Sequence, residues 1–282
     1  MQNETHHGTA SHMSLDVYVI HYSPLTERRK YLALSLPKKF NAEWITEKVV
    51  KQEDFVVRDF FADNNILGVP LWRISEDLGI NSRSRVKPRI ISRIEGWAYR
   101  MIWKLNPTKE NLVFGAMPSL RRLPNPIVEV THMHIHALEK SKGSAKDWVL
   151  ILEDDAILCE SFEKIVEEIS KSKFKDPVWV NLNAGAGLLR TRFDPKVNHL
   201  GLFQVRPPTT RCATAYMMNR KYVEAALDKF TKFGVPNFLP IDVIMQVINR
   251  SIGAKSFWSD PSVVLQGSED GTYESQLGKY RF

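Results

Sequence analysis

The sequence has few cysteines and no long apolar run. Its two cysteines, Cys159 and Cys212, give neither a disulfide framework nor the spacing of a zinc site. We therefore expect buried free thiols, which are typical of a protein in the reducing cytoplasm. No apolar run approaches the roughly 18–20 residues that cross a bilayer, so we expect no transmembrane helix.

Motifs of several large enzyme classes are also absent. The sequence contains no G-x-G-x-x-G of dinucleotide-binding folds, no Walker A sequence and no G-x-S-x-G nucleophile elbow. Three histidines alternate at His132, His134 and His136, but no glutamate of a zincin motif lies between them. We therefore expect these histidines to be core or hydrogen-bonding residues rather than zinc ligands.

The composition predicts a globular chain with a short N-terminal extension. The hydrophobic content of 43% over 282 residues supports one large domain or two small ones. The first residues are polar, include His6, His7 and His12, and lack the apolar core of a signal peptide. We interpret residues 1–14 as a disordered tail or a cloning remnant, and residues 15–282 as a single catalytic domain.

Strand and helix patterns alternate along the chain. Asp16–Tyr22 is β-branched and aromatic, which predicts a strand, and Ser23 is expected to cap a helix that has Pro24 first and ends near Pro37. Further strands are expected at 42–45, 148–152, 178–182, 214–218 and 261–266, and further helices at 128–140, 221–230 and 241–248 and after Ser161. This alternation predicts an α/β fold.

The block at about 52–127 is unusually basic. It reads as helices at 55–61, 71–78 and 90–105, followed by a proline-rich loop at 106–126, and it is either a helical subdomain or an insertion in the main sheet. Its 83–104 segment holds seven basic residues against a single acid, Glu95, and so carries +6 of the net charge of +7. This pattern indicates an anionic partner such as phosphate, nucleic acid, acidic glycan or a membrane surface, or else a solvated helix face.

Three consecutive acids follow the apolar run W-V-L-I-L at 148–152. Glu153, Asp154 and Asp155 stand where a buried strand ends, and ligands of α/β sheets bind outside the carboxyl ends of strands. Carboxylates gathered there suit Mg²⁺ or Mn²⁺. Because alternate strand residues face opposite sides, we expect Glu153 and Asp155 to share a metal and Asp154 to bond backbone or a nucleotide ribose. The alternative is an acidic turn that caps the next helix.

Arg28 and Arg29 follow the first strand. A helix N-terminus together with guanidinium groups can hold a diphosphate. The two arginines are otherwise ordinary charges on the surface of a helix.

Several stretches, taken in order, resemble glycosyltransferase family 25, the bacterial lipopolysaccharide-type galactosyltransferases that are related to collagen galactosyltransferases. The resemblance covers most of residues 16–275 outside 52–127. The stretches are V-Y-V-I-H-Y-S-P-L-T-E-R-R at 17–29, Thr131-His132, W-V-L-I-L-E-D-D-A at 148–156, C-A-T-A-Y at 212–216, P-I-D at 240–242 and P-S-V-V-L-Q at 261–266.

The resemblance implies a GT-A-like sheet flanked by helices, a nucleotide-sugar donor, most commonly UDP-galactose, a divalent metal and transfer with inversion. Inversion requires a base near the acceptor hydroxyl, and Asp242 is our candidate, with Asp270 and Glu269 in reserve. The alternative for Asp242 is a helix N-cap.

The chain departs from the family at His21-Tyr22, where Asn-Leu is usual, so Tyr22 is expected beside the base or ribose. No histidine follows His199, so either Gln266 or a water takes the place of the C-terminal metal histidine of many GT-A enzymes, or metal binding is weak.

The sequence thus predicts a cytoplasmic, Mn²⁺- or Mg²⁺-dependent hexosyltransferase, with Glu153 and Asp155 on the metal and Asp154, Arg28 and Arg29 on the donor. The acceptor is expected to be a bacterial surface glycan or its lipid-linked precursor, acidic if it meets the basic segment. That segment would also dock the protein on the inner face of the membrane, without specific nucleic acid. The alternatives are a metal-dependent phosphotransferase or nuclease that uses the same acids, and a catalytically inactive glycan-binding module.

Overall fold

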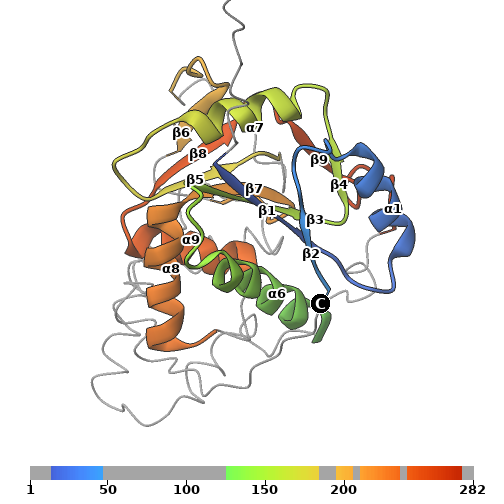
Figure 1. Cartoon of the computed structure of the whole chain (residues 1–282), viewed down its shortest axis with the longest axis horizontal. Helices are drawn as coiled ribbons and strands as arrows, with labels where there is room; N and C mark the ends of the chain where they lie inside the picture. Colours follow the sequence, from blue (N-terminus) through green and yellow to red (C-terminus); the bar gives the residue numbers. More distant parts are fainter. Residues whose placement is uncertain (1–13, 47–124, 184–194, 206–209, 236–239, 275–282) are drawn as a thin grey trace, which may run out of the picture.

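The computed structural model describes residues 14–46, 125–183, 195–205, 210–235 and 240–274, which build a mixed α/β structure around a mostly parallel sheet (Figure 1). Within these ranges the central sheet has seven strands in the order β2-β1-β3-β7-β5-β8-β6. Strands β2, β1, β3, β5 and β8 run in one direction, whereas β7 and β6 run in the other. The α/β prediction is therefore confirmed at this level.

The elements have the following bounds. The central strands are β1 Leu15–Ile20, β2 Glu43–Ile45, β3 Trp148–Glu153, β5 Val178–Asn181, β6 Leu202–Val205, β7 Ala215–Asn219 and β8 Lys255–Ser259. A second, two-stranded sheet pairs β4 Ala156–Leu158 with β9 Val264–Gln266. The helices are α1 Thr26–Ser35, α6 Asn125–Ser141, α7 Phe162–Lys171, α8 Arg220–Phe233 and α9 Ile241–Ser251.

The sheet separates two apolar layers. Strand β3 lies between β1 and β7, and its five apolar residues are at most 1% exposed, which confirms a strand buried on both faces. Val149 and Ile151 pack with α6, α8 and α9 on one face, and Leu150 and Leu152 pack with α1 and α7 on the other. Figure 1 shows α7 and the group of α6, α8 and α9 on opposite sides of the sheet.

The first helix does not begin as predicted. It starts at Thr26, with Leu25 in the cap position, so the prediction of Ser23 as N-cap and Pro24 as first helical residue is wrong. The Tyr22 N–H donates to Asp154 at 3.1 Å and the Leu25 N–H donates to the Tyr22 carbonyl at 2.9 Å. These bonds hold residues 22–25 as a turn, and the helix can begin only after it.

Other boundaries also differ from the sequence prediction. Ser161 does occupy the cap position of α7, but its side chain makes no capping hydrogen bond. Helix α6 begins at Asn125, inside the stretch predicted as loop. The expected strand at 261–266 is only β9, and it pairs with β4 rather than with the main sheet. Strands β4, β6 and β8 were not predicted at all.

Several predictions fall outside the described residues. They are the tail at 1–13, the helices within 55–105, the basic 83–104 segment and nearly all of the proline-rich loop. Among the helices in the described ranges, none has the length and apolar character needed to cross a membrane.

The strand order creates a crevice beside β1. From β1 the chain passes through α1 to β2 on one side, and it later enters β3 through α6 on the other side. Both neighbours are parallel to β1, and Ile20 at the carboxyl end of β1 pairs with Glu153 at the carboxyl end of β3. Such a switch point is where open α/β sheets bind ligands, so the acids lie at the expected edge of the sheet.

Candidate functional site

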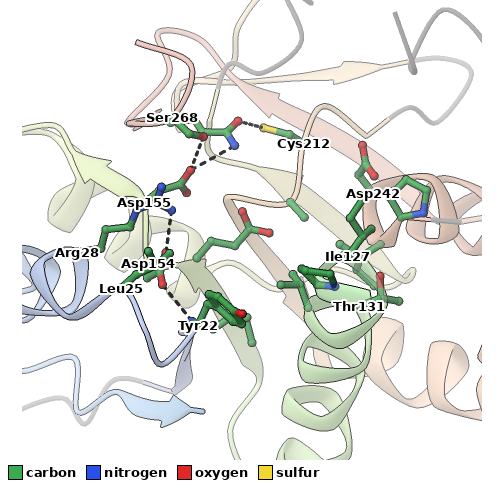
Figure 2. Close-up of a pocket in the computed structure, with 18 residues that line it drawn as sticks. Tyr22, Leu25, Arg28, Ile127, Thr131, Asp154, Asp155, Cys212, Asp242 and Ser268 are labelled. Carbon is green, nitrogen blue, oxygen red and sulfur yellow. Dashed lines mark hydrogen bonds and ion pairs between the residues drawn. The ribbon is translucent and has the colours of Figure 1, made fainter. Parts of the chain in front are cut away.

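A pocket of about 300 Å³ opens at the carboxyl ends of β1 and β3 (Figure 2). This volume is at the lower end of the range of small-molecule sites. Its lining includes all but one of the site residues proposed from the sequence, namely Tyr22, Arg28, Glu153, Asp154, Asp155, Asp242 and Gln266. The exception is Arg29, which is exposed and lies over the ring of Trp44 at 5.0 Å. Adjacent helix residues do not face each other, and α1 accordingly presents Arg28 to the pocket and Arg29 to the Trp44 ring outside it.

Asp154 is held by partners from the segment after β1 and from α1. Its carboxylate bonds the His21 ring at 2.9 Å, the Tyr22 N–H at 3.1 Å and the Arg28 guanidinium at 3.3 Å. Burial raises the pKa of Asp154, and these three partners oppose that shift. The expected bond to backbone is therefore present, and Asp154 ties the first βα unit to the end of β3.

Arg28 is engaged within the protein as well as lining the pocket. Besides Asp154, its guanidinium donates to the carbonyl of Glu274 at 2.7 Å and lies over the Tyr273 ring at 5.1 Å. It fastens the 266–274 segment against α1. Its expected role on a diphosphate is therefore confined to the part of the guanidinium that faces the pocket.

Asp155 lies on the other side of the turn from Asp154. One carboxylate oxygen, Oδ2, accepts hydrogen bonds from Ser268 at 2.6 Å and Gln266 at 3.4 Å. The other oxygen, Oδ1, is buried and has no hydrogen-bond partner in the described residues. Burial, followed by the charge of Glu153, raises the pKa of Asp155 to about 6. A buried carboxylate oxygen without a partner is a position where a cation or donor is missing.

Glu153 reaches the same pocket from the last position of β3. His134 approaches its Oε1 at 3.0 Å, and Thr214 donates to its Oε2 at 3.5 Å. Its side chain is 22% exposed, so its carboxylate is the more accessible of the pair. All three acids line the pocket, but the Asp154 carboxylate is bonded to His21, Tyr22 and Arg28. Strand β3 ends at Glu153, so Asp154 and Asp155 lie in a turn and their directions are not set by strand alternation.

The pair fits a hard divalent cation. In the described part of the chain, no three His, Cys, Asp or Glu side chains gather as a ligand set. Mg²⁺ and Mn²⁺ need fewer protein ligands, because they keep waters and bind through one or two carboxylates together with substrate phosphates. The unpartnered Asp155 Oδ1 beside Glu153 is the feature of this structure that matches such an ion.

Asp242 lines the opposite side of the pocket from Asp155 (Figure 2). It lies in the first turn of α9, whose cap residue is Pro240, so the alternative interpretation of Asp242 as the N-cap is wrong. Its carbonyl accepts a hydrogen bond from Thr210 at 2.7 Å, which fixes the start of the helix. The reserve candidates Glu269 and Asp270 are exposed and do not line this pocket.

Gln266 and Cys212 close the side of the pocket next to Asp155. Gln266 donates to Asp155 and accepts from the Cys212 thiol at 3.2 Å. Burial raises the pKa of the Cys212 thiol to about 12, so it is protonated and donates. Both cysteines are free as predicted, and each residue is half-buried rather than fully buried. Gln266 thus meets the acidic pair through Asp155.

Three pocket neighbours had no assigned role from the sequence. Ser268 contacts Asp155 across 113 positions, and no local pattern predicts such a contact. Thr131 lines the pocket, is 1% exposed, and its hydroxyl has no hydrogen-bond partner among the described residues. His134 is the hydrogen-bonding histidine that the sequence allowed, and its spacing from Ile127 and Thr131 is the signal that places it on the same helix face.

Comparison of the sequence with models of protein families gave no match, and comparison with curated proteins gave none.

Proposed function

We propose that the protein is a metal-dependent inverting glycosyltransferase that moves a hexose, galactose from UDP-galactose in the first instance, to a glycan acceptor. The observation that carries the proposal is the unpartnered, buried Asp155 Oδ1 beside Glu153 in a pocket that Asp242 lines from the other side. The pair provides a place for a cation with a diphosphate, and Asp242 provides a base at a distance from it. A base takes the proton of the attacking hydroxyl in an inverting displacement, and a cation would offset the charge that develops on the leaving diphosphate.

The finer fold assignment is also a proposal, namely a GT-A-like nucleotide-sugar domain. It is supported by a largely parallel sheet with its acids at the β1–β3 switch point, and by the resemblance to glycosyltransferase family 25. The motif stretches lie far apart in the sequence, yet Tyr22, Thr131, Glu153, Cys212, Asp242 and Gln266 from them all line one pocket.

The acids have separate roles in this proposal. Glu153 and Asp155 would hold Mn²⁺ or Mg²⁺, which when bound offsets the charge that grows on the departing diphosphate. Asp154 positions the first βα unit through its three bonds, and thereby places Tyr22 and Arg28 on the donor side of the pocket. Ser268 and Gln266 hold Asp155 Oδ2, so that Oδ1 would be left to bind the ion.

Asp242 would act on the acceptor. Its carboxylate accepts the proton of the acceptor hydroxyl while that oxygen bonds to the anomeric carbon and the bond from this carbon to the diphosphate breaks. Attack from the side opposite the diphosphate inverts the configuration. The position of Asp242 across the pocket from the acidic pair supports this assignment.

The acceptor we propose is a bacterial surface glycan or its lipid-linked precursor. The +6 charge of the 83–104 segment supports an acidic acceptor or docking at the inner face of the membrane. This segment lies outside the described residues, so its support comes from the sequence alone.

A thermal-shift series tests the proposal. Ligand binding to the folded state raises the melting temperature, so UDP or UDP-galactose should raise it by several degrees with Mn²⁺ and by little with EDTA. Asp155→Ala should lose the metal-dependent part of this rise in melting temperature. Asp228→Asn, which changes an exposed acid of α8, should keep it. The absence of a shift with any nucleotide sugar would reject a glycosyltransferase. Stabilisation by DNA or RNA with steep salt dependence would favour the nuclease alternative.

A further inference from the structure

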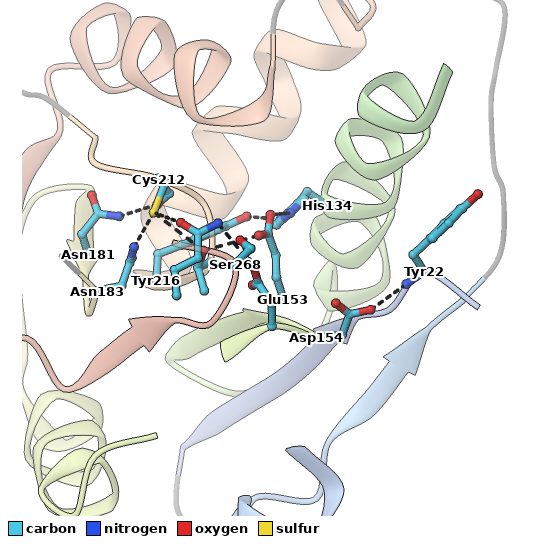
Figure 3. Close-up of polar contacts among 12 residues, drawn as sticks. Tyr22, His134, Glu153, Asp154, Asn181, Asn183, Cys212, Tyr216 and Ser268 are labelled. Atoms are coloured by element: carbon cyan, nitrogen blue, oxygen red, sulfur yellow. Dashed lines mark hydrogen bonds and ion pairs between the residues drawn. The ribbon is translucent and has the colours of Figure 1, made fainter. Parts of the chain in front are cut away.

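A buried row of polar and aromatic side chains lies beneath the acidic pair. His134 is fully buried on α6, with its Nε2 at 3.0 Å from Glu153 Oε1 and its Nδ1 at 2.7 Å from the Tyr216 hydroxyl (Figure 3). Its ring stacks on Tyr216, and Tyr216 stacks on Trp179 with ring centroids 4.1 Å apart. Trp179 is fixed in turn by its bond to Asn181 at 2.9 Å.

The direction of these hydrogen bonds follows from their chemistry. Burial raises the pKa of Tyr216 well above its usual value, so its hydroxyl is protonated. In the described residues this hydroxyl has no hydrogen-bond partner other than His134. A phenol that donates to Nδ1 leaves the proton of the imidazole on Nε2, where it points at the Glu153 carboxylate.

The opposite arrangement is unfavourable at both ends. A proton on Nδ1 would direct the Nε2 lone pair at a carboxylate oxygen 3.0 Å away and leave the buried Tyr216 proton without an acceptor. A doubly protonated His134 ring would also leave the Tyr216 hydroxyl proton without an acceptor. The Nε2–H form alone satisfies all three groups.

We propose that His134, held in the Nε2–H tautomer by Tyr216, is the positioning residue of Glu153. The inference rests on the proposed function, because Glu153 is one side of the cation site described above. The His134 N–H occupies one lone-pair direction of Glu153 Oε1 and so restrains the carboxylate, whose other oxygen accepts from Thr214. Partners of this kind typically change metal affinity about 10–100-fold when they are removed.

The sequence offers a matched control. Tyr222 is as fully buried as Tyr216, and it also packs on Trp179, at 5.6 Å. Its hydroxyl faces the Met245 sulfur at 3.7 Å and does not contact His134 or Glu153. Tyr216→Phe and Tyr222→Phe therefore remove the same atom from the same core, and only the first should affect the cation site.

The first measurement reads the tautomer directly in the metal-free protein. Long-range proton–nitrogen NMR spectra of ¹⁵N-histidine-labelled protein distinguish the two ring nitrogens, and His134→Gln identifies the His134 signals. We expect the neutral Nε2–H form in the wild type and in Tyr222→Phe, and a mixture of tautomers in Tyr216→Phe. An Nδ1–H or doubly protonated ring in the wild type overturns the inference.

The second measurement is Mn²⁺ affinity by isothermal titration calorimetry. We expect Tyr216→Phe to bind about tenfold more weakly and Tyr222→Phe to remain within about twofold of wild type. His134→Gln, which keeps an N–H donor, should bind better than His134→Leu. Equal affinities of the two phenylalanine variants contradict the inference while leaving the proposed function intact. A wild type that binds no Mn²⁺ contradicts the proposed metal site, and the NMR measurement then decides the inference alone.

Discussion

The Ser268 hydroxyl donates to Asp155 Oδ2 at 2.6 Å and leaves Asp155 Oδ1 buried without a partner in the described residues. In the Asp155 carboxylate, one oxygen thus accepts hydrogen bonds from the protein and the other accepts none from the described residues. Its neighbour Asp154 has both oxygens bonded, to His21, Tyr22 and Arg28. The two acids therefore differ in function although they are adjacent, and this difference has measurable consequences.

Neutralising Asp155 should stabilise the metal-free protein at neutral and alkaline pH. Its pKa is raised in the folded state, so the folded protein binds a proton more tightly than the unfolded chain, and stability falls as the pH rises through about 6. We expect Asp155→Asn to raise the free energy of unfolding by on the order of 2 kcal/mol at pH 8. Urea unfolding at pH 8 and pH 4 checks the sign.

The gain should shrink at pH 4, where Asp155 is protonated in the wild type. Asp228→Asn serves as the control, because Asp228 is exposed on α8. A loss of stability in Asp155→Asn at pH 8 would show that its charge is already compensated within the protein.

Removing Asp154 should have the opposite effect. Asp154→Ala leaves the buried Arg28 guanidinium, the His21 ring and the Tyr22 N–H without their shared acceptor, and we expect a loss of about 3 kcal/mol. A double-mutant cycle of Asp154→Ala with Arg28→Ala separates the Asp154–Arg28 interaction from the other contacts of Asp154. We expect a coupling of at least about 1 kcal/mol between the two residues. Additive effects would contradict the assignment of Asp154 as the tie between α1 and β3.

Gly267 holds the C-terminal segment close to the site. A Cβ at this position would lie 2.4 Å from the Tyr273 ring and 3.1 Å from the Asp155 carbonyl. We expect Gly267→Ala to destabilise the protein by about 2 kcal/mol by displacing Tyr273 from Arg28. Chemical denaturation of Gly267→Ala, Tyr273→Ala and the double variant tests this. The double variant should lose less free energy of unfolding than the sum of the two single losses, because without the Tyr273 ring the added Cβ has nothing to clash with there. Fully additive losses would argue against the clash.

Much of the fold was predictable because its signals are local. The apolar run at 148–152 and the spacing of Phe162, Val166 and Ile169 are short-range patterns, and both elements formed as predicted. Strand β8 was missed because Lys255–Ser259 mixes charged, polar and aromatic residues. Its burial comes from pairing with β5 and β6. Ser23 looked like a helix cap, but the distant Asp154 holds the chain in a turn there.

The candidate site divides in the same way. The acids and Asp242 were recognisable because their motifs are contiguous in the sequence. The contacts of Ser268 and His134 with Asp155 and Glu153 depend on the tertiary fold. Arg28 and Arg29 look equivalent in the sequence, and only the packing of α1 distinguishes a buried arginine from an exposed one.

The hydroxyl of Thr131 provides another test of the pocket. It is buried without a partner in the described residues, which costs free energy in the unliganded protein. We expect Thr131→Val, which has nearly the same shape, to raise the free energy of unfolding by about 1 kcal/mol, as measured by urea unfolding. Thr131→Ser keeps the hydroxyl, so its free energy of unfolding should not rise. A loss of more than about 1 kcal/mol in the valine variant would show that the hydroxyl has a partner.

We propose that Glu153 and Asp155 hold a divalent ion through which the nucleotide diphosphate binds. Calorimetric titration of UDP into wild type and Asp155→Asn, each with Mn²⁺ and with EDTA, tests it most directly. We expect UDP to bind the wild type with Mn²⁺ and to bind at least about tenfold more weakly with EDTA. We expect Asp155→Asn to lose the Mn²⁺ dependence although its fold should be more stable. Equal UDP affinity in all four titrations would contradict it.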